Sequence, residues 1–309
     1  MKINKVEISN FRALKKVVVP LDQFSVLIGE NDVGKTSFLY ALDKFFNGKK
    51  INTKDDFFCG KIDDDIVICI TFNNLQKDED LDKIKHTNGQ IVIKKIFSFD
   101  LPPKAYSLSE DGSEKPISSD LLKKYFSNDS FHFIPVRRDL LVQFSMSKTA
   151  LLGKTIRAKM HEAVKSTDKS NSVSNVEKLL TSAVQEPRKQ LENFLREQMN
   201  NEDLGLIFDD LSVDPVEGVS FLVKLSDEKV DKTPIENRGA GTQNNLIIAL
   251  FRLVASSNVG GKIVFAMEEP ENSLHPKAQR QLLSVLQAIS NESQVIVTTH
   301  SPVFVERSK

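Results

Sequence analysis

A glycine-rich segment near the N-terminus has the residue types and spacing of a loop that cradles phosphate. Residues 29–36, Gly-Glu-Asn-Asp-Val-Gly-Lys-Thr, fit the pattern G-x-x-x-x-G-K-[ST] at every defined position. The glycines allow backbone N–H groups to curl around a phosphate, and the N-terminus of a following helix adds a partial positive charge. Lys35 is expected to reach the β- and γ-phosphates of a nucleoside triphosphate, and Thr36 to hold Mg²⁺. The residues predicted to bind the nucleotide here are Asn31, Gly34, Lys35, Thr36 and Ser37.

Two acidic residues at the end of an apolar run, Ile263–Met267, could complete such a site. The run reads as a strand and is followed directly by Glu268 and Glu269. A strand beside a phosphate loop delivers carboxylates to the metal, so Glu268 is predicted to bind Mg²⁺ through water and Glu269 to orient or activate the attacking water. Paired acids at a strand end also occur in solvated turns, and the residues that follow favour the functional interpretation.

A histidine follows the next apolar strand. Glu271–Pro276, with the sequence Glu-Asn-Ser-Leu-His-Pro, continues the acidic block, and Val295–Thr298 reads as a second strand that leads to His300. A lone histidine after a strand is usually structural. The separation of Glu269 and His300 along the sequence, with a helix predicted between them, favours a contact of His300 with the γ-phosphate. Glu269 and His300 are therefore the predicted catalytic residues.

The elements around these residues are those that a phosphate loop requires. The strand Phe24–Ile28 precedes the loop and the apolar-periodic helix Thr36–Phe46 follows it, which argues against a chance match on a turn. Further strands are predicted at Lys5–Ser9, Val17–Val19, Ile66–Phe72, Ile91–Phe97, Phe131–Val136 and Val219–Leu225, further helices at Asp78–Ile84, Asn244–Val254 and Pro276–Ile289, and a turn-rich loop at Ser109–Pro116.

Residues 139–203 have a different pattern, with apolar positions at helical spacing. Ser174 and Glu177 form a predicted capping box for one helix. Pro187 is predicted to start a second helix, where its missing N–H costs nothing. The apolar stripes of this helical insertion serve either as core alone or as a dimerisation element.

The composition is that of an ordinary globular chain. Its 309 residues contain 42 Lys and Arg and 42 Asp and Glu, so the net charge of zero offers no overall attraction to nucleic acid. DNA binding would have to come from local patches or from a further domain. We find no membrane-length apolar run and no signal-peptide pattern. Cys59 and Cys69 are too few for a disulfide framework, and we expect a cytoplasmic protein.

Together, the phosphate loop, the Glu-Glu-Pro-Glu-x-x-Leu-His-Pro block and the Thr-Thr-His-Ser segment that contains His300 resemble SMC/RecF-type ABC ATPases. They resemble more closely the ATPase domain of the OLD (overcoming lysogenisation defect) family, to which the Gabija defence nuclease belongs. The opening Ile8–Ala13, Ile-Ser-Asn-Phe-Arg-Ala, is similar to the usual start of this family. The resemblance implies an α/β fold: an ABC-type P-loop ATPase head with a mixed sheet and a helical insertion, which uses ATP and Mg²⁺.

The resemblance also implies roles for residues outside the phosphate loop. Such ATPases have a signature loop that caps the γ-phosphate of a neighbouring protomer, and the best match is Asn237–Gln243, with Gly239 and Gly241. It reads Arg-Gly-Ala-Gly instead of the commoner Leu-Ser-Gly-Gly, and a simple glycine turn before a helix is the alternative. Arg12 is expected near the nucleotide base, although a surface salt bridge explains it equally well.

Other family features have no firm match. Arg137 and Arg138 could line the γ-phosphate or a DNA face, or form surface salt bridges. Gln76 and Gln143 are both candidates for the Q-loop glutamine, and neither has support.

The resemblance implies an ATP-linked homodimer or higher homo-oligomer with DNA and a nuclease as partners, and no membrane. We expect residues 1–138 and 204–309 to form the ATPase lobe around the insertion 139–203. Nine residues follow His300, so we expect the C-terminal TOPRIM nuclease of the OLD family to be absent and this chain alone to cleave no DNA. The leading hypothesis is the ATPase part of an anti-phage nuclease. The alternatives are a RecF- or SMC-like DNA clamp and a stand-alone subunit that controls a separate nuclease.

Overall fold

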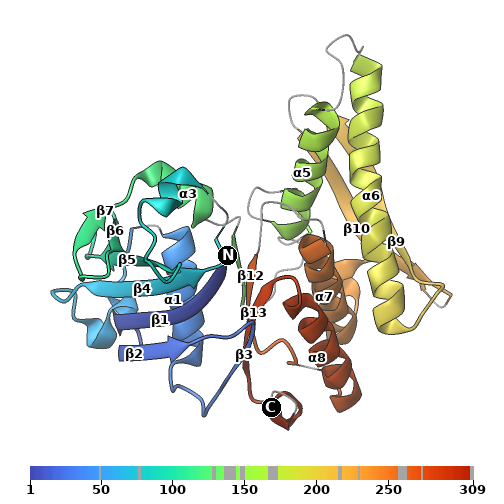
Figure 1. Cartoon of the computed structure of the whole chain (residues 1–309). Coiled ribbons are helices and arrows are strands. Elements are labelled where there is room, and N and C mark those ends of the chain that lie inside the picture. Colours follow the sequence, from blue (N-terminus) through green and yellow to red (C-terminus); the bar gives the residue numbers. More distant parts are fainter. Residues whose placement is uncertain are drawn as a thin grey trace. The chain divides into compact units, whose positions relative to one another are not determined.

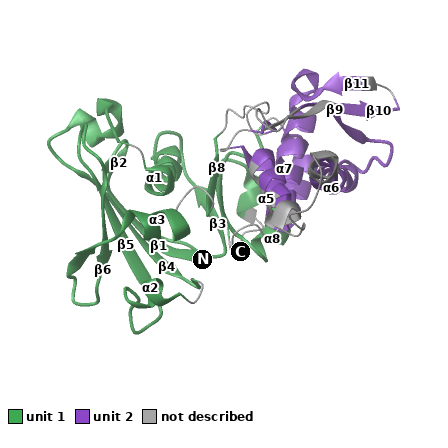
Figure 2. Cartoon of the chain, turned by 90° about the horizontal axis from the view of Figure 1, so that it is seen from above, with its two compact units in different colours: residues 1–136, 260–272, 286–309 green, residues 137–259, 273–285 purple. Residues whose placement is uncertain are grey.

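A computed structural model describes residues 1–48, 50–75, 78–126, 130–135, 144–146, 150–165, 173–214, 218–228, 230–256, 263–272 and 274–306 (Figure 1). The chain divides into two compact units (Figure 2). Unit 1 contains residues 1–136, 260–272 and 286–309, and unit 2 contains residues 137–259 and 273–285.

Unit 1 contains a six-stranded antiparallel sheet. In spatial order its strands are β2 (Leu14–Pro20), β1 (Lys2–Phe11), β4 (Ile66–Asn73), β5 (Ile91–Phe97), β6 (Lys104–Leu108) and β7 (Glu114–Pro116). Buried and less buried side chains alternate along β5, where every second residue is buried. This period of two gives the sheet one apolar face, which packs into the core.

A four-stranded parallel sheet forms the other half of unit 1. Its order is β3 (Phe24–Ile28), β13 (Gln294–Thr299), β12 (Val264–Glu268) and β8 (Phe131–Ile134). Every residue of β12 and β13 is buried. Continuous burial of this kind is typical of parallel strands that are covered on both faces. Because all four strands are parallel, their carboxyl ends lie along one edge of the sheet.

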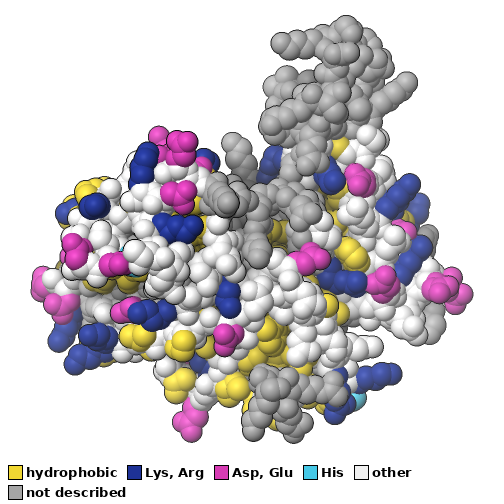
Figure 3. Space-filling view, viewed as in Figure 1, with side chains coloured by type: hydrophobic (Ala, Val, Ile, Leu, Met, Phe, Trp, Pro, Cys, Tyr) yellow, Lys and Arg dark blue, Asp and Glu magenta, His cyan; other side chains and the backbone are white. Residues whose placement is uncertain are grey.

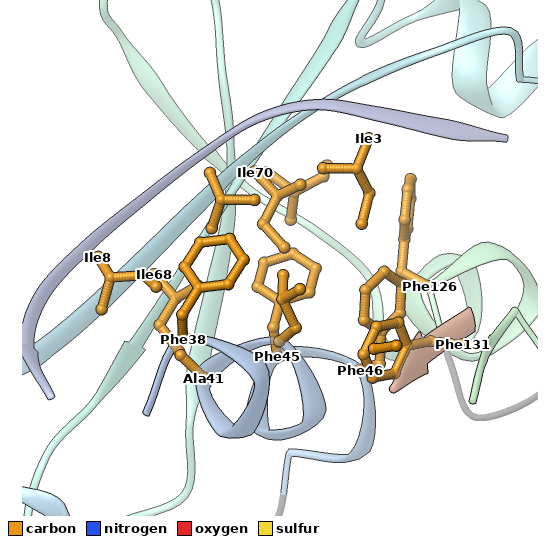
Figure 4. Packing of buried hydrophobic residues seen from close by; sticks show 14 of the residues in the cluster. Ile3, Ile8, Phe38, Ala41, Phe45, Phe46, Ile68, Ile70, Phe126 and Phe131 are labelled. Atoms are coloured by element: carbon orange, nitrogen blue, oxygen red, sulfur yellow. The ribbon is translucent and has the colours of Figure 1, made fainter. Parts of the chain in front are cut away.

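Helix α1 (Lys35–Asn47) contributes to the core that joins both sheets of unit 1 (Figure 4). Phe38, Phe45 and Phe46 are buried along it, and the rings of Phe46 and Phe131 of β8 stack with centroids 4.6 Å apart. Truncation of one such buried phenylalanine to alanine typically costs about 3–5 kcal/mol. The packing of these rings therefore fixes the position of α1 in unit 1.

Short helices complete unit 1: α2 (Glu79–Asp82), α3 (Ser119–Tyr125), α9 (Pro302–Glu306) and the 3₁₀ turns η1 (Lys54–Asp56) and η2 (Phe58–Gly60). Asp78 caps α2 by accepting a hydrogen bond from the Asp80 N–H at 3.0 Å. Its carboxylate also accepts from the Tyr125 hydroxyl and from Lys124 Nζ, which is 2.7 Å away. These hydrogen bonds tie α2 to α3.

Unit 2 contains helices and a small antiparallel sheet. Its elements are α5 (Leu151–Lys165), α6 (Val173–Met199), β9 (Gly205–Asp214), β10 (Gly218–Asp227), β11 (Val230–Pro234), η3 (Ile235–Asn237), α7 (Ala240–Ser256) and the greater part of α8 (Pro276–Ser290). Helix α6 packs against α5, α7 and β9, and it buries Val184, Leu191 and Leu195 completely. None of the helices in the described ranges is long and apolar enough to cross a membrane.

The predicted α/β class is confirmed, with the antiparallel and parallel strands in separate sheets. One helix prediction was wrong: Pro187 does not start a helix but lies inside α6. An internal proline removes a backbone hydrogen bond at a cost of roughly 3 kcal/mol. Burial of Val184 before it and of Leu191 and Leu195 after it offsets that cost. Helix α6 begins at Val173, and the side chains of Ser174 and Glu177 lie outside the described ones.

Smaller differences include two element boundaries and a strand that was not predicted. Residues 114–116 form strand β7, so the turn after β6 ends at Ser113, whose carbonyl accepts from the Ser109 N–H at 2.9 Å. Helix α7 begins at Ala240, four residues before its predicted start. Strand β9 was not predicted, because Asp209 and Asp210 interrupt its apolar pattern. In the structure, antiparallel pairing with β10 supplies hydrogen-bond partners for its backbone.

Candidate functional site

The phosphate loop of unit 1 joins β3 to α1, as its sequence predicts. Gly34 is the residue before α1 and has φ +98°, a backbone conformation that residues with a side chain rarely adopt. A Cβ atom at this position would lie 2.6 Å from Leu14 Cδ2, so an added side chain would also have to displace Leu14. Asp32 also has positive φ, at 62°. The loop thus folds back tightly before the helix begins.

Lys35 spans this loop. Its Nζ donates hydrogen bonds to the carbonyl oxygens of Gly29, at 2.7 Å, and Glu30, at 2.6 Å. The ammonium group therefore lies beside the N-terminus of α1, where free backbone N–H groups and the helix dipole already favour an anion. Asn31 at the loop tip is exposed, whereas Ser37 in the first turn of the helix is buried.

Thr36 and Glu268 meet although they are 232 residues apart in the sequence. Glu268 is the last residue of β12 and is buried, and its Oε1 accepts a hydrogen bond from the Thr36 hydroxyl. Oxygen atoms of these two types are ligands that Mg²⁺ prefers. Among the described residues, no three His, Cys, Asp or Glu side chains cluster as a metal site. The phosphates and water would therefore have to supply the remaining ligands of a metal ion here.

Glu269 and His300 also converge. Glu269 follows β12 with φ +42°, and its N–H donates to the Thr298 carbonyl at 2.9 Å, which ties the turn to β13. The imidazole Nε2 of His300 lies 3.4 Å from Glu269 Oε1, and both side chains are partly exposed. The carboxyl ends of β12 and β13 thus bring together the two residues predicted to be catalytic.

Arg12 is held in place by two partners that the sequence analysis missed. Its N–H donates to the Asp56 carbonyl at 3.0 Å, and its Nε donates to Asp56 Oδ1 at 2.8 Å. The guanidinium carbon lies 4.3 Å from the centroid of the Tyr40 ring, a cation–π distance. Tyr40 lies four residues after Thr36 on α1, and this helical spacing could have identified it. Burial, and then the nearby Glu268 carboxylate, raise the pKa of the Tyr40 hydroxyl.

A pocket of about 690 Å³ adjoins Arg12. It is lined by Arg12, Ala13, Thr53, Asp55, Asp56, Phe57, Cys59 and Gly60. Ala13 also lies close to the phosphate loop, since its Cβ would be 3.7 Å from a Cβ at Gly34. Arg12 therefore forms the salt bridge that was one of its two interpretations, and it also faces an open space next to the loop.

The predicted signature loop lies in unit 2 and is braced by two side chains. Arg238 donates from its Nη atoms to Asp227 Oδ2, at 3.0 Å, and to the Leu225 carbonyl, at 2.8 Å. Gln243 Nε2 donates to the Arg238 carbonyl at 2.8 Å. A Cβ atom at Gly239 or Gly241 would meet nothing within 4 Å. Packing therefore does not require these two glycines, and the space above them is open.

Several predicted features lie outside the described residues. They are Arg137, Arg138, Gln76 and Gln143. Over the described part of the face in Figure 3, basic and acidic side chains are interspersed. This face thus shows no patch of one sign that would favour DNA.

Comparison with known proteins identifies the family. A family profile described as "AAA ATPase domain", AAA_15, matches residues 1–127 and 103–305. The chain belongs to this ATPase family. Among curated relatives, an "OLD nuclease" of Thermus scotoductus is 25% identical over 98% of the chain and 60% of its own length. "Endonuclease GajA" of Bacillus cereus is 25% identical over 98% of the chain and 56% of its own length.

The AAA_15 chain therefore spans somewhat more than half the length of these curated relatives, and the predicted resemblance to OLD-family ATPase domains is confirmed. Solved SMC heads show the same fold. A head bound to the C-terminal winged-helix domain of ScpA has a TM-score of 0.70 at 16% identity, covering 99% of this chain and 91% of that one. The Pyrococcus furiosus head with an extended coiled coil has a TM-score of 0.67 at 14% identity, covering 98% and 91%.

Proposed function

We propose that this ATPase domain binds ATP with Mg²⁺ at the loop 29–36, hydrolyses it at Glu269, and uses the cycle to regulate DNA binding or cleavage by an OLD-type nuclease. The observation that carries the proposal is the convergence of four side chains at the carboxyl ends of β12 and β13. Thr36 meets Glu268, and Glu269 meets His300. A phosphate loop with only a structural role would not need two carboxylates and an imidazole beside it.

The proposal assigns a distinct task to each group. Lys35 neutralises the β- and γ-phosphates, since its ammonium already lies in the loop. Thr36 and Glu268 would hold Mg²⁺, which would neutralise charge on the phosphate oxygens when bound. Glu269 orients the attacking water and accepts its proton, and His300 donates a hydrogen bond to the γ-phosphate. Catalysis of this kind depends mainly on positioning and charge stabilisation.

A second copy of the chain completes the site in this proposal. Gly239 and Gly241 leave open space at the N-terminus of α7, which suits the close approach of a phosphate. Ile28, which precedes the phosphate loop, and Val33, within it, are 50% and 55% exposed, an unusual environment for two aliphatic side chains. Coverage by a partner protomer would bury both. ATP would then join two copies, and hydrolysis would release them.

The link to nucleic acid rests on the relatives. The curated relatives are named as nucleases, and the chain spans 56–60% of their length. We infer that the ATPase cycle controls a nuclease that lies on the same polypeptide or on a partner, in defence against phage. The similarity to SMC heads favours a second candidate, an ATP-gated DNA clamp. DNA binding that requires ATP but leads to no cleavage would favour the clamp.

The central test separates nucleotide binding from hydrolysis. Lys35→Ala should abolish ATP binding in calorimetric titrations, because no other described cation lies within the loop. Glu269→Gln should keep ATP binding but lower the rate of phosphate release by roughly 10²-fold or more, the usual scale for loss of a catalytic base. It should also trap the ATP-bound dimer, which light scattering would detect.

Exposed residues of the same types provide matched controls. Lys61→Ala and Glu292→Gln change exposed side chains and should match the unaltered protein in both assays. Turnover at the normal rate by Glu269→Gln would refute its assignment. ATP binding by Lys35→Ala at unchanged affinity would refute the position of the nucleotide.

A further inference from the structure

Glu271 is a buried carboxylate that the proposed mechanism does not use. It lies two residues after Glu269, beyond Pro270, and is only 6% exposed. Its Oε1 accepts two hydrogen bonds, one from the Thr299 hydroxyl and one from the main-chain N–H of His300 at 3.2 Å. Its Oε2 is enclosed and accepts no hydrogen bond from the residues that the structure describes. The bonding of this carboxylate is therefore directed at residues 299 and 300.

The same carboxylate organises the chain after β13. Thr299 is fully buried and, besides donating to Glu271, accepts a hydrogen bond from the Ser301 N–H at 2.9 Å. The Ser301 hydroxyl in turn accepts from the Val303 N–H at 3.2 Å in the first turn of α9. Successive backbone N–H groups at the end of β13 are thus satisfied by side chains, and Glu271 is the one that comes from outside this segment.

His300 depends on this arrangement because its imidazole has little else to hold it. Among the described residues its one polar partner is Glu269, at 3.4 Å, and the side chain is 39% exposed. Glu269 is itself tied to β13 through the Thr298 carbonyl. The separation of the two side chains is therefore set by main-chain contacts at positions 298 and 300. Glu271 supplies the contact at position 300.

We propose that Glu271 is a positioning residue for His300, which fixes the main chain of this histidine so that the imidazole stays beside Glu269 and the γ-phosphate. This inference rests on the proposed function, since it requires that His300 contributes to hydrolysis. A carboxylate that accepts a hydrogen bond from a main-chain N–H in a buried position is a strong positional constraint. If it moved away, the donor would lose its hydrogen bond. A displacement of about 1 Å at a reacting group can cost about 10²-fold in rate.

A double-mutant cycle tests the inference. Glu271→Leu should lower kcat by about 10–100-fold while KM changes little, because the phosphate loop is untouched. His300→Ala should lower kcat by a comparable factor, and it keeps the N–H that Glu271 contacts. The double variant should then be less than about 3-fold slower than His300→Ala, because residues that act through one another are not additive. Two independent contributions that multiply in the double variant would overturn the proposal.

Substitutions of similar size guard against a simple folding defect. Glu271→Gln keeps an oxygen that can accept both hydrogen bonds and should restore most of the kcat that Glu271→Leu loses. Glu271→Asp keeps the charge but shortens the side chain by one methylene, so it should behave like Glu271→Leu, and it replaces that variant in the cycle if the leucine protein does not fold. Glu292→Leu, at an exposed position, is the control for substitution as such.

The outcomes distinguish failure of the inference from failure of the proposed function. An unchanged kcat in both Glu271→Leu and Glu271→Asp, with a clear loss in His300→Ala, would overturn the role of Glu271 alone. An unchanged kcat in His300→Ala would overturn the role of His300 and with it the inference. Equal losses of kcat and of ATP affinity in Glu271→Asp would indicate a structural role only and would also overturn it.

Discussion

The stability of unit 1 should depend on pH through one buried lysine. Lys95 on β5 points into the core with only 7% of its surface exposed, its Nζ donates to the Phe45 carbonyl near the end of α1, and it lies 4.7 Å from the centroid of the Phe45 ring. Burial lowers the pKa of its ammonium group to about 8, from 10.5. Between these values the unfolded chain holds a proton that the folded chain has released. Stability therefore rises as the pH increases from about 8 to 10.5.

The size of this effect follows from the pKa shift. A shift from 10.5 to about 8 corresponds to about 3 kcal/mol of destabilisation that is fully present below pH 8 and mostly relieved by pH 10. Lys95→Met removes this titration, and at either pH it also removes the hydrogen bond to the Phe45 carbonyl. The buried charge destabilises the unaltered protein at pH 7 but hardly at pH 10, where the folded chain has released the proton. Relative to the unaltered protein, the variant should therefore be less stable at pH 10 than at pH 7 by roughly 2–3 kcal/mol.

Urea denaturation at pH 7 and at pH 10 measures this difference. The change in unfolding free energy caused by Lys95→Met should differ between the two pH values by roughly 2–3 kcal/mol. Lys61→Met, at an exposed position, corrects for the other groups that titrate in this range and should show no such difference. An equal effect of Lys95→Met at both pH values would refute the argument that burial of the charge, more than loss of its contacts, controls this position.

Further predictions concern glycines in the loops of both units and the core of unit 2. Gly34→Ala should lower the unfolding free energy by about 1–3 kcal/mol and weaken ATP binding, because it combines positive φ with the overlap on Leu14, whereas Gly112→Ala, which meets no neighbour, should cost less in thermal melting. Gly239→Val should leave the melting temperature nearly unchanged but abolish ATP-dependent dimerisation by light scattering; unchanged dimerisation would argue against a phosphate contact there. Leu191→Ala should cost about 2–5 kcal/mol by urea denaturation, and a smaller loss would contradict its full burial in unit 2.

Local sequence predicted the elements on which the site is built. The phosphate loop needs glycine at position 34, because the backbone there adopts φ +98°, and such a requirement is visible in the sequence itself. The strand β12 ends at Glu268, where a long apolar run gives way to charge. In both cases the chemical constraint acts within a few residues, so residue type and spacing report it directly.

Local sequence was less informative where packing over long distances competes with intrinsic preference. Pro187 is a strong signal for a helix start, yet α6 continues through it because burial of Leu191 and Leu195 outweighs the lost hydrogen bond. Asp209 and Asp210 weaken the strand pattern of β9, yet pairing with β10 holds the strand in place. No window of neighbouring residues contains these partners.

The sequence by itself determined which residue types could bind phosphate and metal, and that strands would deliver them, because loop conformation and strand periodicity depend on near neighbours. Only the tertiary structure decided which of these side chains meet. Thr36 reaches Glu268, and Arg12 reaches Asp56 and Tyr40, through contacts between segments that are distant or unrelated in pattern. The role inferred for Glu271 has the same origin. Its two donors are residues 299 and 300, and the parallel pairing of β12 with β13, which the order of strands in the sheet decides, brings them to its carboxylate.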